Sequence, residues 1–318
     1  MKILITGAAG FIGSHVADAL LERGDTLIAV DNFNDYYSPK NKKSNIKQAQ
    51  TNENYSIHNA DILDIEGMKA IFEQTTPGKV IHLAARAGVR PSLENPGLYA
   101  DVNIKGLINM LELAKEFKIQ NFISGSSSSV YGANKKVPFA ESDPVNSPIS
   151  PYAATKRAGE LICSTYHHLY KINISCLRFF TVYGERGRPD MAPYKFTKAI
   201  SEGKEITMYG DGTTKRDYTY IDDIVSGIIA ALDRNHGFEI FNLGNSKTVP
   251  LKHLIETIEN ALGKKAKIRR MPLQPGDVTI TYADITKSKK LLGYSPETSI
   301  EQGIRNFVKW YTQTNSPA

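Results

Sequence analysis

Short apolar segments rich in β-branched residues alternate with amphipathic helical segments through the first 184 residues of this 318-residue chain. This alternation is typical of βαβ crossovers, in which parallel strands form a sheet and the intervening helices cover both faces. Strands are predicted at 2–7, 26–31, 79–85, 121–132 and 174–184, and helices at 12–24, 68–75, 100–117 and 152–170. The sequence therefore predicts an α/β fold with a Rossmann-type doubly wound parallel sheet.

The alternation becomes less regular after residue 184. Further helices are predicted at 190–204, 224–234, 251–264 and 299–314, with strand and turn over 206–223. We therefore divide the chain into a sheet-forming domain over 1–180 and a smaller C-terminal α/β region over 181–318. The second region is expected to bind substrate and to cross back to the first domain.

The motif "TGAAGFIG" places Gly7, Gly10 and Gly13 directly after the first predicted strand and at the start of the first predicted helix. Glycines in this position permit a tight turn and let the backbone approach a pyrophosphate at the helix N-terminus. Asp31 ends the next strand, where a carboxylate accepts hydrogen bonds from the ribose hydroxyls of NAD and repels the 2′-phosphate of NADP. The motif in this context predicts an NAD-binding site.

A second motif, "PYAATK", places Tyr152 and Lys156 at positions i and i+4 of a predicted helix. A tyrosine with a pKa of about 10 is a poor base at neutral pH. A nearby ammonium group favours the phenolate and lowers that pKa. Such a pair also occurs on ordinary helix surfaces, so a second signal is needed to indicate a site. The hydroxyl cluster "SSSSVYG" at 126–132 supplies it, because this cluster lies at the carboxyl end of a predicted parallel strand, where ligands bind in open α/β sheets.

Composition excludes several classes of protein. The formal net charge is +6, from 39 Lys and Arg against 33 Asp and Glu, and the basic residues are scattered, which argues against nucleic-acid binding. The lysine cluster at 40–43 is interpreted as a solvated loop. The two cysteines, Cys163 and Cys176, are interpreted as buried free thiols and not as a disulfide or metal site. No signal peptide or membrane span is apparent, so we expect a cytoplasmic protein.

The motifs "TGAAGFIG", "HLAA", "SSSSVYG", "PYAATK" and "LRFFTVYG" together resemble the extended short-chain dehydrogenase/reductase family of nucleotide-sugar epimerases and dehydratases. The resemblance covers essentially the whole chain. It implies that Tyr152 is the catalytic base and that Lys156 tunes it while holding the nicotinamide ribose. It also implies that Ser127 hydrogen-bonds the sugar 4-hydroxyl, although Ser126 and Ser129 are close enough to take that role.

The same resemblance implies a tightly bound NAD that is regenerated in each turnover. Asp61 and Ile62 match the residues that contact adenine, and Ala84 and Ala85 match small residues beneath the cofactor. His82 is interpreted as a strand residue and not as an acid or base, because the tyrosine already fills that role. No metal site is predicted. The residues expected to contact NAD are Gly7, Gly10, Phe11, Ile12, Gly13, Asp31, Asn32, Asp61, Ile62, Leu83, Ala84, Ala85, Asn103, Ser126, Tyr152, Lys156 and Phe179.

Reactions in the family begin alike, with removal of the 4-hydroxyl proton and hydride abstraction from C4 by NAD. The 4,6-dehydratases then use an acidic pair where this chain has Ser128 and Ser129, so dehydration is disfavoured. Rotation of the 4-keto intermediate and hydride return give a 4-epimerase. The stretches "RFFTVYGERGRPDMA", "RAGVR" and "MPLQPGDV" are similar to UDP-glucuronate 4-epimerases within the family, which implies conversion of UDP-glucuronate to UDP-galacturonate.

The arginines at 178, 186 and 188 lie among aromatic residues and indicate an anionic ligand. In the epimerase interpretation, Thr181 and Arg188 bind the C5 carboxylate, because an arginine fork matches a carboxylate bidentately. Arg186 is interpreted as a turn or surface residue. Arg216 is assigned to the diphosphate, Asp277 to the uridine ribose, and Tyr209 and Phe196 to the uracil. The full set of predicted substrate contacts is Arg90, Ser127, Ser129, Tyr152, Thr181, Arg188, Tyr209, Arg216 and Asp277.

Two positions depart from the family's pattern. Glu185 stands where a proline is common and brings a negative charge beside the expected carboxylate site, and Pro91 stands where a tyrosine is common. The 4-keto form of glucuronate is a β-keto acid and decarboxylates readily when its carboxylate is poorly held. Thr181 and Arg188 are therefore hypothesised to prevent the loss of carbon dioxide.

The sequence leaves three alternatives open. One is a 4-epimerase for the neutral sugars of UDP-glucose or UDP-N-acetylglucosamine, and another is a UDP-glucuronate decarboxylase. A third, from a different class, is a non-catalytic NAD-binding sensor, which the fold alone does not exclude. The expected partners are a UDP-sugar and a second copy of the chain, with the helices at 101–117 and 152–170 forming a four-helix dimer interface, and no nucleic acid or membrane.

Overall fold

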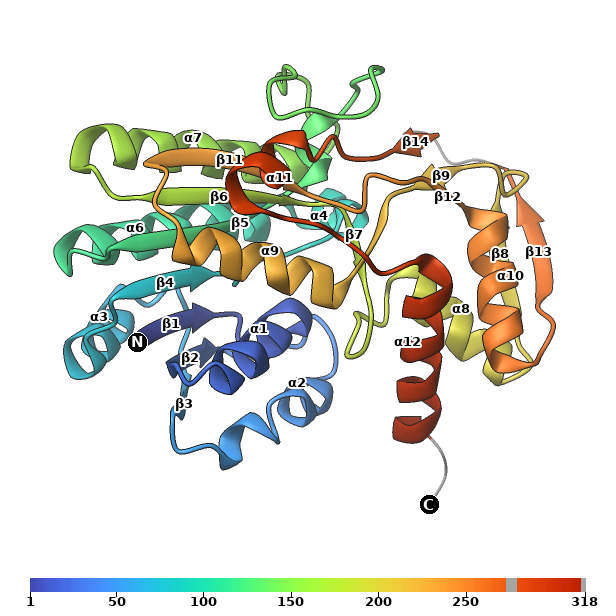
Figure 1. Ribbon diagram of the computed structural model, residues 1–318, viewed down its shortest axis with the longest axis horizontal. Coiled ribbons are helices and arrows are strands. Elements are labelled where there is room, and N and C mark those ends of the chain that lie inside the picture. The colour runs from blue at the N-terminus through green and yellow to red at the C-terminus, as the bar shows by residue number, and fades with distance from the viewer. Residues whose placement is uncertain (273–278, 316–318) are drawn as a thin grey trace.

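Seven strands form one fully parallel sheet in the structure, a computed structural model that describes residues 1–272 and 279–315 (Figure 1). The order across the sheet reverses between β1 and β4, so the carboxyl ends of these two neighbours flank the point where doubly wound sheets bind ligands. This confirms the predicted fold class. In order across the sheet, the strands are β11 (Phe238–Leu243), β6 (Ile174–Phe179), β5 (Asn121–Ser127), β4 (Lys79–His82), β1 (Lys2–Thr6), β2 (Thr26–Asp31) and β3 (Tyr55–Asn59).

Helices cover both faces of this sheet because successive side chains of a strand point to opposite faces. On one face, Ile3 and Ile5 of β1 belong to a core that includes α1 (Phe11–Glu22) and α9 (Ile221–Asp233). On the other face, Leu4 belongs to a core shared with α3, α6 and α7. The remaining helices of this part are α2 (Pro39–Asn45), α3 (Ile65–Thr75), α4 (Val89–Glu94), α5 (Pro96–Ala100), α6 (Gly106–Glu116), α7 (Pro151–Tyr170) and α11 (Thr286–Leu292).

Part of the C-terminal region forms a smaller α/β layer, and Figure 1 shows α8, α10 and α12 grouped on the side of the molecule away from α3 and α6. Strand β11, which follows residue 180, lies in the large sheet, so the chain crosses back to the first region as it runs. The elements outside the large sheet are α8 (Ala192–Ser201), α10 (Leu251–Leu262), α12 (Ile300–Asn315), β7 (Thr181–Tyr183) paired with β10 (Tyr218–Tyr220), β8 (Glu205–Tyr209) paired with β13 (Lys267–Met271), and β9 (Lys215–Arg216) between β12 (Val249–Pro250) and β14 (Ile280–Thr281).

The structure corrects one prediction near the first domain's glycine turn. The segment at 40–43 is not a solvated loop but part of α2, and Lys42 is buried there against Asp31, with 3.3 Å between Nζ and Oδ1. The sequence pattern concealed this because the lysines on either side are exposed and only one turns inward. Cys163 and Cys176 are both free and buried, as predicted. Within the described residues, no helix is both long and apolar enough to cross a lipid bilayer.

Candidate active site

A cavity of about 570 Å³ opens at the carboxyl ends of the parallel strands, and the glycine turn forms one end of it. Gly7 has a φ of +70°, and a Cβ there would lie 2.8 Å from the backbone nitrogen of Ala84. A Cβ on Gly13 would lie 2.2 Å from the carbonyl oxygen of Gly7. These close approaches leave the first turn of α1 open toward the cavity, where its unpaired amides favour an anion.

Asp31 lies in the cavity wall at the end of β2 and is nearly fully buried. Its Oδ2 accepts a hydrogen bond from the Ala9 nitrogen at 3.1 Å, and its Oδ1 accepts from the Phe33 nitrogen at 2.8 Å. Lys42 pairs with the same carboxylate. The charge of Lys42 is therefore already neutralised, so this lysine does not offer a free cation to a 2′-phosphate.

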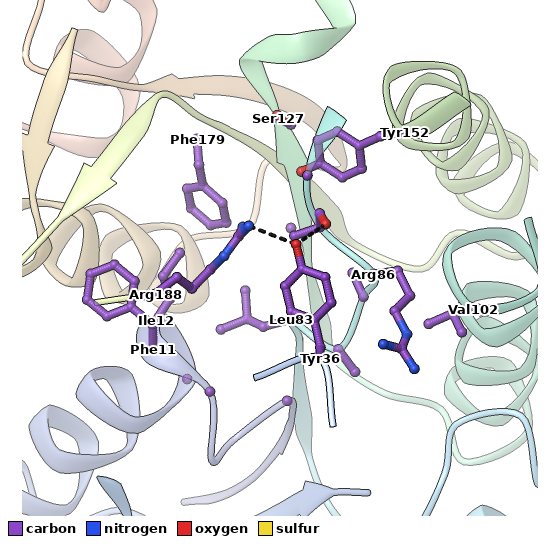
Figure 2. A pocket seen from close by; sticks show the side chains of 18 of the residues that line it. Phe11, Ile12, Tyr36, Leu83, Arg86, Val102, Ser127, Tyr152, Phe179 and Arg188 are labelled. Atoms are coloured by element: carbon purple, nitrogen blue, oxygen red, sulfur yellow. Dashed lines mark hydrogen bonds between the residues drawn. The ribbon is translucent and has the colours of Figure 1, made fainter. Parts of the chain in front are cut away.

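The predicted catalytic residues meet at the other half of the cavity. Tyr152 lies in the first turn of α7, which begins at this point because Ser150 accepts a hydrogen bond from the Ala153 nitrogen at 3.1 Å and Pro151 occupies the first helical position. Lys156, one turn later, donates to the Gly125 carbonyl of β5 at 2.7 Å. Ser127 ends β5, and all three residues line the cavity. Figure 2 shows Ser127 and Tyr152 close to each other there.

Burial dominates the electrostatics of this group. It raises the pKa of the Tyr152 phenol, while a hydrogen bond with Ser127 and the charge of Arg188 act in the opposite direction. Burial also lowers the pKa of Lys156 to about 8. The Arg188 guanidinium is thus a cation that favours the Tyr152 phenolate, and the tuning of the phenol by Lys156 stays a prediction.

A buried ion pair supports the serine end of the site. Arg178 of β6 donates from Nε to Oε1 of Glu160 at 2.8 Å and from Nη2 to Oε2 at 2.9 Å. Ser126 donates to the same Oε1 at 2.7 Å, so the ion pair fixes the strand end that carries Ser127. The anion that Arg178 meets is thus a glutamate of the chain and not a ligand. Removing one partner of such a buried pair costs about 3–5 kcal/mol.

The other two arginines of the "RFFTVYGERGR" stretch have different surroundings. Arg186 pairs with Asp18 of α1 at 2.6 Å, consistent with its interpretation as a structural residue. Arg188 lines the cavity, and its Nε and Nη2 donate to the two carboxylate oxygens of Asp190 at 3.0 and 2.6 Å. Its Nη2 also donates to the Tyr36 hydroxyl at 2.9 Å, and Figure 2 shows the guanidinium beside the Tyr36 ring.

Glu185, which the sequence placed beside the carboxylate site, has its side chain elsewhere. Its carboxylate accepts hydrogen bonds from the Tyr220 hydroxyl at 2.8 and 3.0 Å, and Glu185 is not among the described residues that line the cavity. Pro91 does line it. The expected repulsion between Glu185 and a bound carboxylate therefore has no basis in the geometry.

Most of the predicted contact residues lie around this one cavity. The described lining includes Gly7, Gly10, Phe11, Ile12, Gly13, Asp31, Asn32, Asp61, Ile62, Leu83, Ala84, Ala85, Arg90, Ser126, Ser127, Ser129, Tyr152, Lys156, Phe179, Thr181 and Arg188.

A few predicted contact residues lie elsewhere. Asn103 is buried behind the wall, where its Oδ1 accepts from the Arg86 nitrogen at 2.8 Å. Tyr209 stacks with Arg90, 5.5 Å from ring centre to guanidinium carbon, and Phe196 packs against the core. Arg216 lies on β9, outside the described cavity lining, and Asp277 falls outside the described residues.

Sequence reasoning missed a group of cavity residues between β2 and α4. This group contributes Asn34, Tyr36, Tyr37, Lys42 and Arg86 to the wall. The signal available was the pair of adjacent tyrosines after Asp31, in a segment with neither helical nor strand periodicity, since aromatic residues in such a segment often face a ligand site.

A dinucleotide cradle and a Ser–Tyr–Lys set that share one cavity on a doubly wound sheet define an extended short-chain dehydrogenase/reductase. A family model described as GDP-mannose 4,6 dehydratase matches residues 4–307, and the chain belongs to this family. Relatives that match this chain are named for other reactions than the dehydration in that description.

Relatives and solved structures with several substrates match the whole chain. A UDP-glucuronate 4-epimerase of Thermodesulfobacterium geofontis is 48% identical over 96% of this chain and 95% of its own. The crystal structure of UDP-glucuronic acid 4-epimerase from Bacillus cereus with UDP-glucuronic acid and NAD is 38% identical, with a TM-score of 0.92 over 99% and 100% of the two chains. A UDP-glucose 4-epimerase of Thermotoga maritima with UDP-glucose is 34% identical, with a TM-score of 0.91 over 99% of each chain.

Proposed function

We propose that the protein is an NAD-dependent 4-epimerase that converts UDP-glucuronate to UDP-galacturonate. The observation that carries the proposal is that Arg188, Thr181 and the Ser127–Tyr152 pair line one cavity, so a single sugar can meet a cation and a base together. The relatives named UDP-glucuronate 4-epimerase support the same substrate.

The glycine turn and Asp31 fit NAD. Only glycine fits at positions 7 and 13 of the turn, which lets its backbone approach a pyrophosphate, and Asp31 lies at the end of β2, where a carboxylate binds the ribose hydroxyls. Bound NAD supplies the hydride acceptor and donor for C4 of the sugar. The pairing of Lys42 with Asp31 supports NAD over NADP, since a 2′-phosphate would meet the Asp31 carboxylate and Lys42 is already paired.

The chain's own residues move the proton. Tyr152 accepts the proton of the sugar 4-hydroxyl as base and returns it to the 4-keto oxygen after the sugar has turned. Ser127 hydrogen-bonds the phenol and the same sugar oxygen, and Lys156 holds the nicotinamide ribose. Arg188 and Thr181 hold the C5 carboxylate throughout.

A neutral UDP-hexose is the second candidate substrate, and one observation favours it. Asp190 already neutralises Arg188, so the pocket does not present a bare cation that would require an acidic sugar. A UDP-glucose 4-epimerase with the same fold is consistent with this candidate.

We also propose that the working unit is a dimer of two copies joined along α7. Leu161 and Leu169 lie two turns apart on this helix and are 53% and 59% exposed, and Leu93 of neighbouring α4 is 62% exposed. Exposed large apolar side chains on neighbouring helices are typical of an interface.

Steady-state kinetics with UDP-glucuronate and UDP-glucose tests the substrate. We expect kcat/KM to favour UDP-glucuronate at least tenfold in the wild type, and Arg188→Ala to remove that preference, because one ion pair contributes about 1–3 kcal/mol. The matched control is Arg186→Ala, which removes an arginine outside the described cavity lining. Equal preference in the wild type and in Arg188→Ala would contradict the carboxylate role.

A further inference from the structure

The contacts of Arg188 determine which of its N–H groups are available to a ligand. A guanidinium has five N–H donors. Asp190 takes one from Nε and one from Nη2, and the Tyr36 hydroxyl takes the second from Nη2. Only the two N–H groups of Nη1 have no hydrogen-bond partner among the described residues. A bidentate grip on a substrate carboxylate, which uses two nitrogens, therefore conflicts with the present arrangement.

Tyr36 is itself firmly held. Its hydroxyl donates to the Ala87 carbonyl at 2.6 Å, and the Arg188 guanidinium lies 5.3 Å from the centre of its ring (Figure 2). Gly88, which follows Ala87 in the chain, has a φ of +101°. A Cβ at Gly88 would lie 2.8 Å from the Tyr36 hydroxyl oxygen and 3.5 Å from Nη2 of Arg188. The backbone thus approaches both groups at a point where only glycine fits.

We propose that Tyr36 and Asp190 are positioning residues, which fix the Arg188 guanidinium so that Nη1 alone faces the carboxylate of the sugar. The inference rests on the proposed function. Tyr36 comes from the cofactor side of the cavity and Asp190 from the segment before α8, so the two halves of the chain hold this arginine together.

The orientation matters because the 4-keto sugar acid can lose carbon dioxide. In that step the C5–C6 bond breaks, its electron pair moves into an enolate on C5, C4 and the 4-oxygen, and C6 leaves as carbon dioxide. A proton then adds at C5 to give a 4-keto pentose. The negative charge leaves the carboxylate during the step, so a cation fixed on that carboxylate stabilises the starting state and slows the loss. A guanidinium that turns away from the carboxylate, or moves with the negative charge toward the 4-oxygen, no longer slows the loss of carbon dioxide.

The product mixture formed from UDP-glucuronate tests this inference. Proton NMR measures UDP-pentose, with its 4-keto form, as a fraction of all products for the wild type, Tyr36→Phe, Asp190→Ala and Asp190→Asn. We expect Tyr36→Phe and Asp190→Ala to raise the pentose fraction about tenfold, the equivalent of one well-placed hydrogen bond to a charged group. Asp190→Asn keeps a side-chain oxygen for Nε and should raise it less. The matched control is Asp18→Asn, which alters the neighbouring arginine–aspartate pair outside the described cavity lining.

The same substitutions made in an Arg188→Ala background separate positioning from a general structural effect. If Tyr36 and Asp190 act through Arg188, they change the pentose fraction no further once the arginine is absent. Product mixtures equal to the wild type in the single variants, or equal increments with and without Arg188, would overturn the inference while leaving the epimerase intact. A wild-type protein that converts no UDP-glucuronate would instead contradict the proposed function, and this inference with it.

Discussion

Arg188 and Tyr152 are coupled through charge. Burial raises the pKa of the Tyr152 phenol, and the Arg188 guanidinium lowers it. Because the phenolate is the base, replacing this cation raises the pKa and shrinks the reactive fraction at neutral pH. We therefore expect Arg188→Gln to move the acid limb of the kcat/KM profile to higher pH by about one unit. An acid limb at the same pH in Arg188→Gln and in the wild type would show that the charge does not reach the phenol.

His82 gives the protein a dependence of stability on pH. Burial, together with the charge of Lys156, lowers the pKa of His82 to about 3, from an ordinary value of about 6.5. Below pH 6.5 the unfolded chain binds a proton that the folded chain does not, so stability falls as the pH falls toward 3. From pH 7 to pH 5 this amounts to about 2 kcal/mol in the free energy of unfolding.

Thermal unfolding at pH 7 and pH 5 checks this contribution. His82→Asn keeps a polar atom near Thr6, whose hydroxyl lies 2.8 Å from Nδ1 of His82, but it removes the titration, so its melting temperature should change less between the two pH values. His168→Asn, on the exposed surface of α7, is the control and should behave as the wild type. Identical pH dependence in all three proteins would contradict the assignment.

For single residues, the sequence predicted which side chains carry the chemistry better than it predicted which way other side chains point. Motifs predict four of the cavity residues, because a helix start or a strand end sets their positions: Tyr152, Lys156, Ser127 and Asp31. The side chain of Glu185 points to Tyr220 and not to the cavity, and Lys42 turns inward from an apparently polar loop. Those orientations depend on partners far away in the sequence, which no local pattern contains.

The turn before α1 is the element on which the cofactor site depends. In Gly13→Ala the new Cβ would lie 2.2 Å from the Gly7 carbonyl oxygen, so the turn must shift. We expect NAD affinity to fall at least tenfold and the free energy of unfolding to drop by about 2 kcal/mol, as for other overpacked sites. Isothermal titration calorimetry with NAD and denaturant unfolding measure the two effects.

Gly97→Ala is the matched control for that substitution. Apart from the adjacent chain and the backbone of α5 itself, no heavy atom of the described residues lies within 4 Å of a Cβ added at Gly97, where alanine should stabilise the helix by up to about 1 kcal/mol. If Gly13→Ala bound NAD as well as Gly97→Ala does, the close contact within the turn would not be what shapes the cofactor site.

Elements with a strong period were predicted well, and those without one were missed. The long helix α7 and strands β1 and β2 have clear patterns, and their bounds lie within two residues of the prediction. Helix α2 has seven mostly polar residues, and the edge strand β3 is only partly buried. Neither carries a run of apolar residues, so neither gave a sequence signal, and β3 pairs with only one strand, β2.

Helix α7 exposes large apolar side chains, among them Leu161 and Leu169. If two copies pair there, Leu161→Glu buries a charge in the interface and should convert the dimer to a monomer, with a loss of at least several kcal/mol of association free energy. Size-exclusion chromatography with light scattering measures the mass of each form. Lys171→Glu, an exposed substitution just past the end of α7, is the control. A wild-type protein that is monomeric at micromolar concentration would contradict the dimer.

In the proposed reaction, a sugar acid is epimerised at C4 by the cofactor bound at one end of the cavity and the Tyr152 base at the other. The most direct test is proton NMR of purified protein with UDP-glucuronate and no added NAD, following the anomeric and H4 signals over hours. We expect signals of UDP-galacturonate that grow to an equilibrium mixture in the wild type and are absent in Tyr152→Phe. Unchanged UDP-glucuronate, with turnover of UDP-glucose by the same sample, would contradict it.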